Sequence, residues 1–164
     1  MSWLPGVVII LTSIVFAMIL AVIALPDYVP LEVGYLRPQW VALVVIYWVI
    51  ALPHRCGPII AWFSGLALDV LMSNLLGHHA LLLAVTAYAA RHLHQRIRMY
   101  GVWQQSLVIL GMMMCYQMIS YWIAGMSGDG RWREWYVLSA VSSALIWPMV
   151  FLVLRYLRRQ FDVS

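Results

Sequence analysis

The chain has 164 residues, of which 65% are hydrophobic and only 10% are charged. A soluble domain carries roughly 25% charged residues, so this chain has too few polar side chains to cover a globule in water, and most of its surface must face lipid. All ten basic residues are arginines, opposed by six acids. They stand at the ends of apolar segments rather than along one polar face, which argues against nucleic-acid binding.

The length allows one transmembrane domain over residues 1–164 and no separate soluble module. The first apolar segment, residues 6–25, has the roughly 20 residues that a helix needs to cross the hydrocarbon core. It ends at Pro26 and Asp27. Because the segment lacks a basic start and a small-residue cleavage site, we expect a retained span rather than a removed signal peptide.

The second apolar segment, residues 39–53, is bounded by Pro38 and Pro53. As a helix it would be only roughly 20 Å long, which is short for a crossing. It either crosses with the help of flanking residues or local thinning of the bilayer, or it only dips in. We favour a crossing, because a proline-bounded apolar run of this length seldom stays in water.

Residues 57–90 are almost continuously apolar. As one helix they would measure roughly 50 Å, too long for a single crossing. The only turn chemistry lies between Ser73 and His79. We therefore expect two spans, residues 57–74 and residues 78–94.

Two further spans are expected over residues 103–124 and residues 136–157. Pro148 lies inside the last one and should kink it. The sequence thus predicts an all-α polytopic bundle of six membrane-spanning helices, or five if the second apolar segment only dips into the bilayer.

Arginines gather in two places that lie on the same side of the membrane in either count. The positive-inside rule assigns both groups, and with them the C-terminus, to the cytoplasm. The side of the N-terminus stays open, because it depends on the second segment. The two groups are Arg91, Arg96 and Arg98 after the fourth span, and Arg155, Arg158 and Arg159 at the end of the last span.

Asp69 is the only acidic residue deep within an expected span. It shares a four-residue repeat with Gly57, Ala61, Gly65 and Ser73, and small residues on such a ridge let another helix approach closely. Its carboxyl group either bonds to a polar side chain of a neighbouring helix or takes a proton or substrate. The candidate bonding partners are Thr86, Tyr88, Gln117, Ser142 and Ser143.

We expect no catalytic, cofactor-binding or metal site and no disulfide. The histidines lack the i, i+4 spacing of a zinc motif and have no carboxylate nearby in sequence. His79, at the turn, is expected to cap backbone groups. An intramembrane enzyme would need a second ionisable residue beside Asp69, and the sequence offers none at span depth.

From Arg37 to the C-terminus, short motifs occur in an order that resembles the MreD family of rod shape-determining membrane proteins, and its gammaproteobacterial branch most. Members often carry glycine where this chain has Ser73, which would ease the turn toward Gly77. The first span matches only as apolar sequence. The motifs are Arg37-Pro38-Gln39-Trp40 with Tyr47-Trp48, Ala51-Leu52-Pro53-His54-Arg55, Gly65-x-x-x-Asp69, Leu76-Gly77-x-His79-Ala80-Leu81, Tyr88, Trp103-Gln104-Gln105, and Trp147-Pro148 before the arginine-rich tail.

The resemblance implies a multi-pass protein of the bacterial inner (cytoplasmic) membrane. The family is similar in architecture to the six-helix substrate-binding subunits of vitamin uptake transporters. It implies a non-enzymatic role in cell-wall elongation, together with the bitopic protein MreC. The pair would link cytoplasmic MreB filaments to the glycan polymerase RodA and its transpeptidase.

Two functions remain open on the sequence. The first is a scaffold that receives a partner's transmembrane helix, while its basic groups contact anionic headgroups or cytoplasmic partners. The alternative is a small-molecule-binding or flippase-like carrier with Asp69 as its polar anchor, which requires a sizeable cavity at that residue. The residues expected to pack helices or bind the partner are Gly65, Asp69, Ser73, Gly77, Arg37 and Trp40.

Overall fold

The computed structural model describes residues 3–23, 37–126 and 136–161. Most of the polar stretch after the first expected span, together with Arg131 and Arg133, lies outside these residues. Over the described residues the fold is entirely helical, and each helix matches one expected segment to within a few residues. The helices are α1 (Trp3–Val22), α3 (Trp40–Ala51), α4 (Pro58–Leu71), α5 (His78–Met99), α6 (Val102–Met126) and α7 (Tyr136–Gln160).

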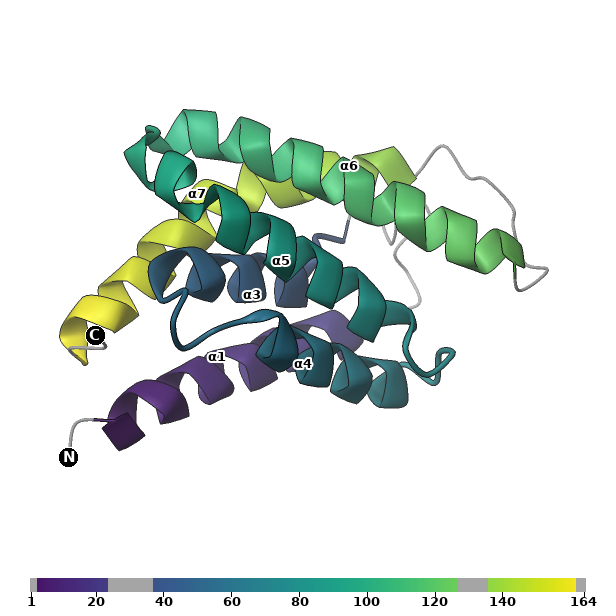
Figure 1. Cartoon of the computed structure of the whole chain (residues 1–164), viewed down its shortest axis with the longest axis horizontal. Coiled ribbons are helices and arrows are strands. Elements are labelled where there is room, and N and C mark those ends of the chain that lie inside the picture. The colour runs from purple at the N-terminus through teal and green to yellow at the C-terminus, as the bar shows by residue number, and fades with distance from the viewer. Residues whose placement is uncertain (1–2, 24–36, 127–135, 162–164) are drawn as a thin grey trace.

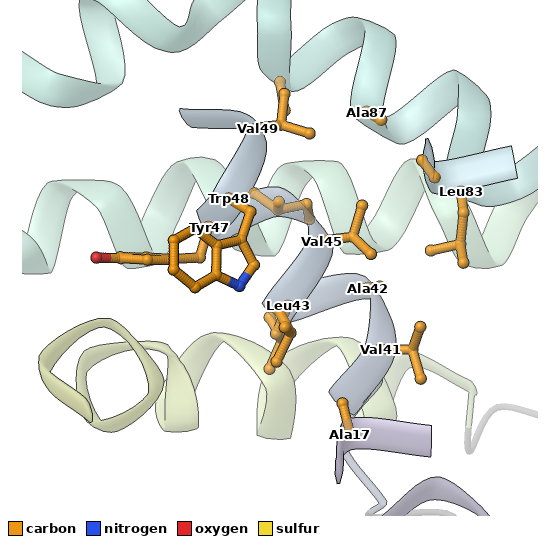
Figure 2. Packing of buried hydrophobic residues seen from close by; sticks show 14 of the residues in the cluster. Ala17, Val41, Ala42, Leu43, Val45, Tyr47, Trp48, Val49, Leu83 and Ala87 are labelled. Atoms are coloured by element: carbon orange, nitrogen blue, oxygen red, sulfur yellow. The ribbon is translucent and has the colours of Figure 1, made fainter. Parts of the chain in front are cut away.

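The short helix α3 lies at the centre of the bundle, in contact with α1, α5 and α7. Each of its residues after the first is buried, and Figure 2 shows how Ala17 of α1 and Leu83 and Ala87 of α5 surround it. A helix that is apolar all round is one that protein covers on every side. At roughly 18 Å, α3 is shorter than the hydrocarbon core, but it does not have to match the bilayer because its neighbours surround it.

Consecutive helices run in alternating directions, so the two chain termini lie at the same end of the molecule (Figure 1). The turn between α4 and α5 lies at the opposite end. α4 packs most extensively on α5, and α6 packs on α7. This up-and-down arrangement brings together, at the end where the termini lie, the segments in which the two groups of arginines stand.

The outer surface is apolar. Large apolar side chains are exposed on three different helices: Ile59 is 72% exposed, Leu107 69% and Leu145 72%. Large apolar side chains exposed on several helices fit a surface that faces lipid. Two helices, α6 and α7, are long and apolar enough to cross a membrane, with mean hydropathies of 1.6 and 2.2, while α1, α3 and α4 are shorter apolar helices.

α5 continues five residues beyond its expected end. Ile97 is fully buried and anchors the last turns to the bundle. The side-chain amide of Gln105 in α6 donates hydrogen bonds to the carbonyls of Ile97 and Tyr100, at 3.1 and 3.2 Å. These bonds satisfy carbonyls that a helix end leaves without partners. α7 is one helix through Pro148, and the kink expected at that residue stays a prediction.

Candidate functional site

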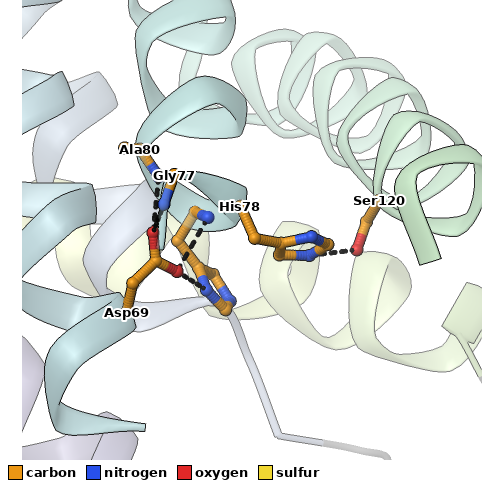
Figure 3. Close-up of polar contacts among 6 residues, drawn as sticks. Asp69, Gly77, His78, Ala80 and Ser120 are labelled. Atoms are coloured by element: carbon orange, nitrogen blue, oxygen red, sulfur yellow. Dashed lines mark hydrogen bonds and ion pairs between the residues drawn. The ribbon is translucent and has the colours of Figure 1, made fainter. Parts of the chain in front are cut away.

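Asp69, near the end of α4, is fully buried, and its carboxylate is bonded to the start of α5 (Figure 3). Oδ2 accepts hydrogen bonds from the backbone N–H groups of Gly77 at 2.9 Å and Ala80 at 3.4 Å. Oδ1 accepts from the backbone N–H of His79 at 2.9 Å and from the ring Nδ1 of His79 at 2.8 Å. The aspartate therefore caps the next helix of its own chain.

The capping is complete. The first four N–H groups of a helix have no partner within it, and here three of them bond to Asp69. The fourth, on His78, donates to the carbonyl of Leu75 at 3.1 Å. A negative charge at this position also interacts favourably with the positive end of the helix dipole.

The backbone of Asp69 also closes the end of its own helix. Its carbonyl accepts the N–H of Asn74 at 3.1 Å, and the carbonyl of Val70 accepts the N–H of Ser73 at 3.4 Å. These two bonds form a Schellman motif. Ser73 has φ of 52° and Gly77 has φ of 98°, so the chain passes twice through the left-handed region within one turn.

The expected partners of Asp69 were wrong. None of the side chains of Thr86, Tyr88, Gln117, Ser142 and Ser143 takes part in its recorded hydrogen bonds. Thr86 and Ser143, for example, donate to the carbonyls of Leu82 and Ser139 in their own helices. The predicted partners were polar side chains of other helices, whereas most of the donors are backbone N–H groups. A usable signal was present, because a carboxylate eight residues before a glycine that opens a helix can reach that helix's first turn.

The expectation for His79 was also wrong. It was assigned to capping backbone groups, and no ionisable residue was expected beside Asp69, but its ring contacts that carboxylate directly. The ring of the neighbouring His78 lies edge-on to the ring of His79, with the two ring centroids 5.0 Å apart. Nε2 of His78 lies 2.9 Å from Oγ of Ser120 and so connects α5 to α6.

The ridge of small residues on α4 is covered by α5. A Cβ atom on Gly65 would lie 2.3 Å from Cα of Ala80 and 2.6 Å from the carbonyl oxygen of His79. At the other end of the ridge, a Cβ on Gly57 would lie 3.6 Å from a guanidinium nitrogen of Arg91. Gly65 thus lies where two backbones almost touch, inside the contact between α4 and α5.

Arg37 and Trp40 lie next to the turn between α4 and α5. They line a pocket of about 150 Å³ together with His79 and Tyr116. The segment before α3 is fixed by α7: Ser139 donates to the carbonyl of Arg37 at 2.8 Å, and the backbone N–H of Gln39 donates to Ser143 at 3.0 Å. Arg37 and Trp40 thus share a pocket with His79, whereas Gly65, Asp69, Ser73 and Gly77 do not line it.

Five of the six arginines of the two basic groups line pockets near the opposite end. Arg98, Arg155, Arg158 and Arg159 line one pocket of about 300 Å³. Arg91 lines another of about 390 Å³ with His54, His92 and His94. Arg96 is exposed outside both. In residues 3–23, 37–126 and 136–161, no three histidine, cysteine or acidic side chains are grouped so as to hold a metal ion.

An apolar groove of about 620 Å³ runs between α1 and α7. Val44 of the central helix lies at its base. The groove spans residues 9–20 of α1, roughly 17 Å along the helix axis. Its walls include Ile9, Phe16 and Leu20 from α1, and Met149, Val153 and Leu157 from α7.

An apolar outer surface, a buried central helix and a carboxylate satisfied inside the bundle define an all-helical membrane protein. The model of the family described as rod shape-determining protein MreD matches residues 3–157, and the chain belongs to this family. It is 29% identical over 136 residues to the rod shape-determining protein MreD of Haemophilus influenzae, covering 82% of this chain and 84% of that protein. No solved structure matches the chain. Membership of the family assigns the chain to rod shape determination.

Proposed function

We propose that this protein is a non-enzymatic scaffold of the cell-wall elongation machinery in the bacterial inner membrane. It crosses the membrane six times, with both termini in the cytoplasm, and acts with an MreC-like bitopic partner to couple MreB filaments to RodA and its transpeptidase. The single observation that favours a scaffold over a carrier is the bonding of the Asp69 carboxylate. Its carboxylate is fully buried and its oxygens already accept four hydrogen bonds from its own chain.

A carrier would need a cavity at this residue. The neighbouring pocket is lined by His79 rather than by Asp69 and holds about 150 Å³. Sites for small molecules typically measure roughly 300–1,000 Å³. The centre of the bundle, where a carrier would hold its substrate, is filled by α3, whose residues after the first are all buried. The interior is therefore built for packing.

The groove between α1 and α7 is the proposed seat of the partner's single transmembrane helix. It is open to the lipid along roughly three helical turns, and its walls are almost entirely apolar. An apolar helix can dock there through side chains spaced three and four residues apart. The ridge at Gly65 does not offer such a surface, because α5 covers it.

Site-specific photocrosslinking tests the groove. Phe16 in the groove and Phe63 on α4 are both 61% exposed, so a photoreactive phenylalanine analogue at each position forms a matched pair. We expect the analogue at position 16 to capture a single-span partner identified by mass spectrometry, and the analogue at position 63 to capture only lipid. Partner capture at position 63 alone, or lipid alone at both positions, would contradict the proposed seat.

Cysteine accessibility at the two ends of α5 tests the proposed orientation in the membrane. In a variant with both native cysteines replaced by serine, Asn74→Cys in the α4–α5 turn should react with a membrane-impermeant maleimide in intact spheroplasts. Gly101→Cys, in the exposed connection between α5 and α6, should react only after the membrane is opened. Labelling of Gly101→Cys in intact spheroplasts would contradict this orientation and indicate the opposite one.

A further inference from the structure

A pocket of about 300 Å³ lies where α3, α5 and α7 end, and four arginine side chains line it. Arg98 comes from α5, and Arg155, Arg158 and Arg159 come from the last turns of α7. Arg98 lies more than fifty positions before the three arginines of α7, so the tertiary fold brings its guanidinium group to theirs.

The positive charges in this pocket have no acidic partner in the described part of the chain. Asp69 is the only acidic residue there. Its carboxylate is bonded at the turn between α4 and α5, at the other end of the bundle. Four like charges around one pocket repel one another, and a bound anion would relieve that repulsion.

Several side chains that line the pocket have partners within the chain. Nη2 of Arg98 donates to the carbonyl of Ala51 at the end of α3, at 3.3 Å. The guanidinium of Arg155 lies 5.9 Å from the ring centroid of Phe151. The buried Gln105 accepts a hydrogen bond from the indole N–H of Trp147 at 3.3 Å while its amide nitrogen bonds to backbone carbonyls. Arg158 is half-buried and the other three arginines are exposed, so the buried part of the pocket wall is formed by other residues, among them Gln105 and Trp147.

The floor of the pocket strengthens any electrostatic interaction inside it. The Trp147 side chain is fully buried, and Tyr47 is 3% exposed. Tyr47 and Arg158 line the same pocket. Charges against such a low-dielectric wall interact more strongly than charges in water.

We propose that this pocket binds a phosphate group. Planar guanidinium groups match phosphate oxygens with paired hydrogen bonds. A volume of about 300 Å³ is at the lower limit for small-molecule sites, which suits one headgroup-sized ligand and excludes a peptide segment. The phosphate belongs either to an anionic lipid of the adjacent leaflet or to a soluble phosphate compound. This site does not depend on the proposed partner helix in the α1–α7 groove.

Native mass spectrometry of the detergent-purified full chain tests the proposal, with phosphatidylglycerol as the lipid probe and phosphatidylcholine as its zwitterionic comparison. The variant Arg155→Gln/Arg158→Gln should lose phosphatidylglycerol adducts by at least about tenfold, because it removes two guanidinium groups that can form charge-assisted hydrogen bonds with the phosphate. Its matched control is Arg91→Gln/Arg96→Gln, which removes the same charge outside this pocket and should lose less than about twofold. Equal losses in the two variants, or no phosphatidylglycerol preference in the parent, would overturn the proposal.

Inorganic pyrophosphate distinguishes the two sources. If millimolar pyrophosphate displaces the lipid and raises the Tm of the parent but not of Arg155→Gln/Arg158→Gln, the pocket takes soluble phosphate compounds. If pyrophosphate has no effect while the lipid adducts still depend on the two arginines, the ligand is a lipid headgroup. The variant Arg155→Lys/Arg158→Lys keeps the charge and serves as a control for misfolding. It should retain partial binding, and full loss in this variant together with an unchanged Tm would point to the paired guanidinium geometry.

Discussion

Oδ1 of Asp69 accepts two hydrogen bonds from the same residue, His79: one from the backbone nitrogen at 2.9 Å and one from ring Nδ1 at 2.8 Å. Because a carboxylate only accepts, Nδ1 of His79 must carry a proton. The pair orients the ring, closes the turn between α4 and α5, and satisfies a buried charge that would otherwise be unpaired.

Replacing Asp69 should destabilise the bundle in a graded way. Asp69→Ala leaves the N–H groups of Gly77, His79 and Ala80 without their acceptor, and we expect a loss of about 3–5 kcal/mol in the free energy of unfolding. Asp69→Asn keeps one acceptor oxygen but not the charge, so its loss should be about 1–2 kcal/mol. Denaturant titration in mixed micelles measures both values. An Asp69→Ala variant as stable as the parent would show that the cap contributes nothing.

The histidine side chain should matter less than the aspartate. His79→Ala removes only the ring bond and keeps the backbone N–H that also bonds to Asp69, so we expect a loss of about 1–2 kcal/mol. His78→Ala, which removes the contact with Ser120 on α6, is the comparison variant. If His79→Ala were as damaging as Asp69→Ala, the backbone bonds would not be the main contribution.

Gly65 should tolerate no side chain. Gly65→Ala would place a Cβ atom 2.3 Å from the Ala80 backbone, so α4 and α5 must separate, at an expected cost of more than about 3 kcal/mol. Gly111→Ala is the control, because a Cβ there meets nothing within 4 Å and alanine favours a helix by about 1 kcal/mol. Thermal unfolding in detergent compares the two. Equal Tm values would refute the close backbone contact.

Ser73→Gly should stabilise the protein. Ser73 has a positive φ of 52° at the position after the end of α4, where a residue with a side chain costs about 1 kcal/mol and glycine does not. We expect the free energy of unfolding to rise by about 0.5–1 kcal/mol. Ser73→Ala keeps the strain and should give no gain. A gain of equal size in both variants would assign the effect to loss of the hydroxyl group instead.

Cys56 should be unreactive in the folded protein. It lies in the connection between α3 and α4, 3% exposed, and burial raises the pKa of its thiol to about 12. At pH 8 only about one thiol in ten thousand would then be ionised, and the thiolate is the reactive form. In a Cys115→Ser variant, maleimide labelling should be slow until detergent denaturation exposes the thiol. Rapid labelling before denaturation would show that this connection opens.

Much of the fold was predictable because lipid imposes a simple rule on sequence. A helix must be apolar where it faces hydrocarbon, so the lengths of apolar runs and the prolines around them gave the six helices to within a few residues. The place of the α4–α5 turn followed from the turn-forming residues between Ser73 and His79. Gly77 fits the left-handed backbone found there, whereas Ser73 adopts it at a cost.

The site was predicted only in part. The sequence identified Asp69 as important, because a carboxylate is costly inside a membrane. It did not identify the donors, because three of the four are backbone N–H groups, and only the spacing between Asp69 and Gly77 pointed to them. It also missed His79, because the contact depends on how the chain reverses between α4 and α5.

The sequence by itself determined which segments are helices, which of them lipid can accept, and where the charges must stop, because transfer of apolar and charged groups between water and lipid depends mainly on residue type. Only the tertiary structure decided that α3 is the buried centre, that Gly65 meets Ala80, and that Arg98 joins the arginines of α7 in one pocket. Those relationships depend on the direction in which each helix faces its neighbours, which is set by the packing of all the helices together.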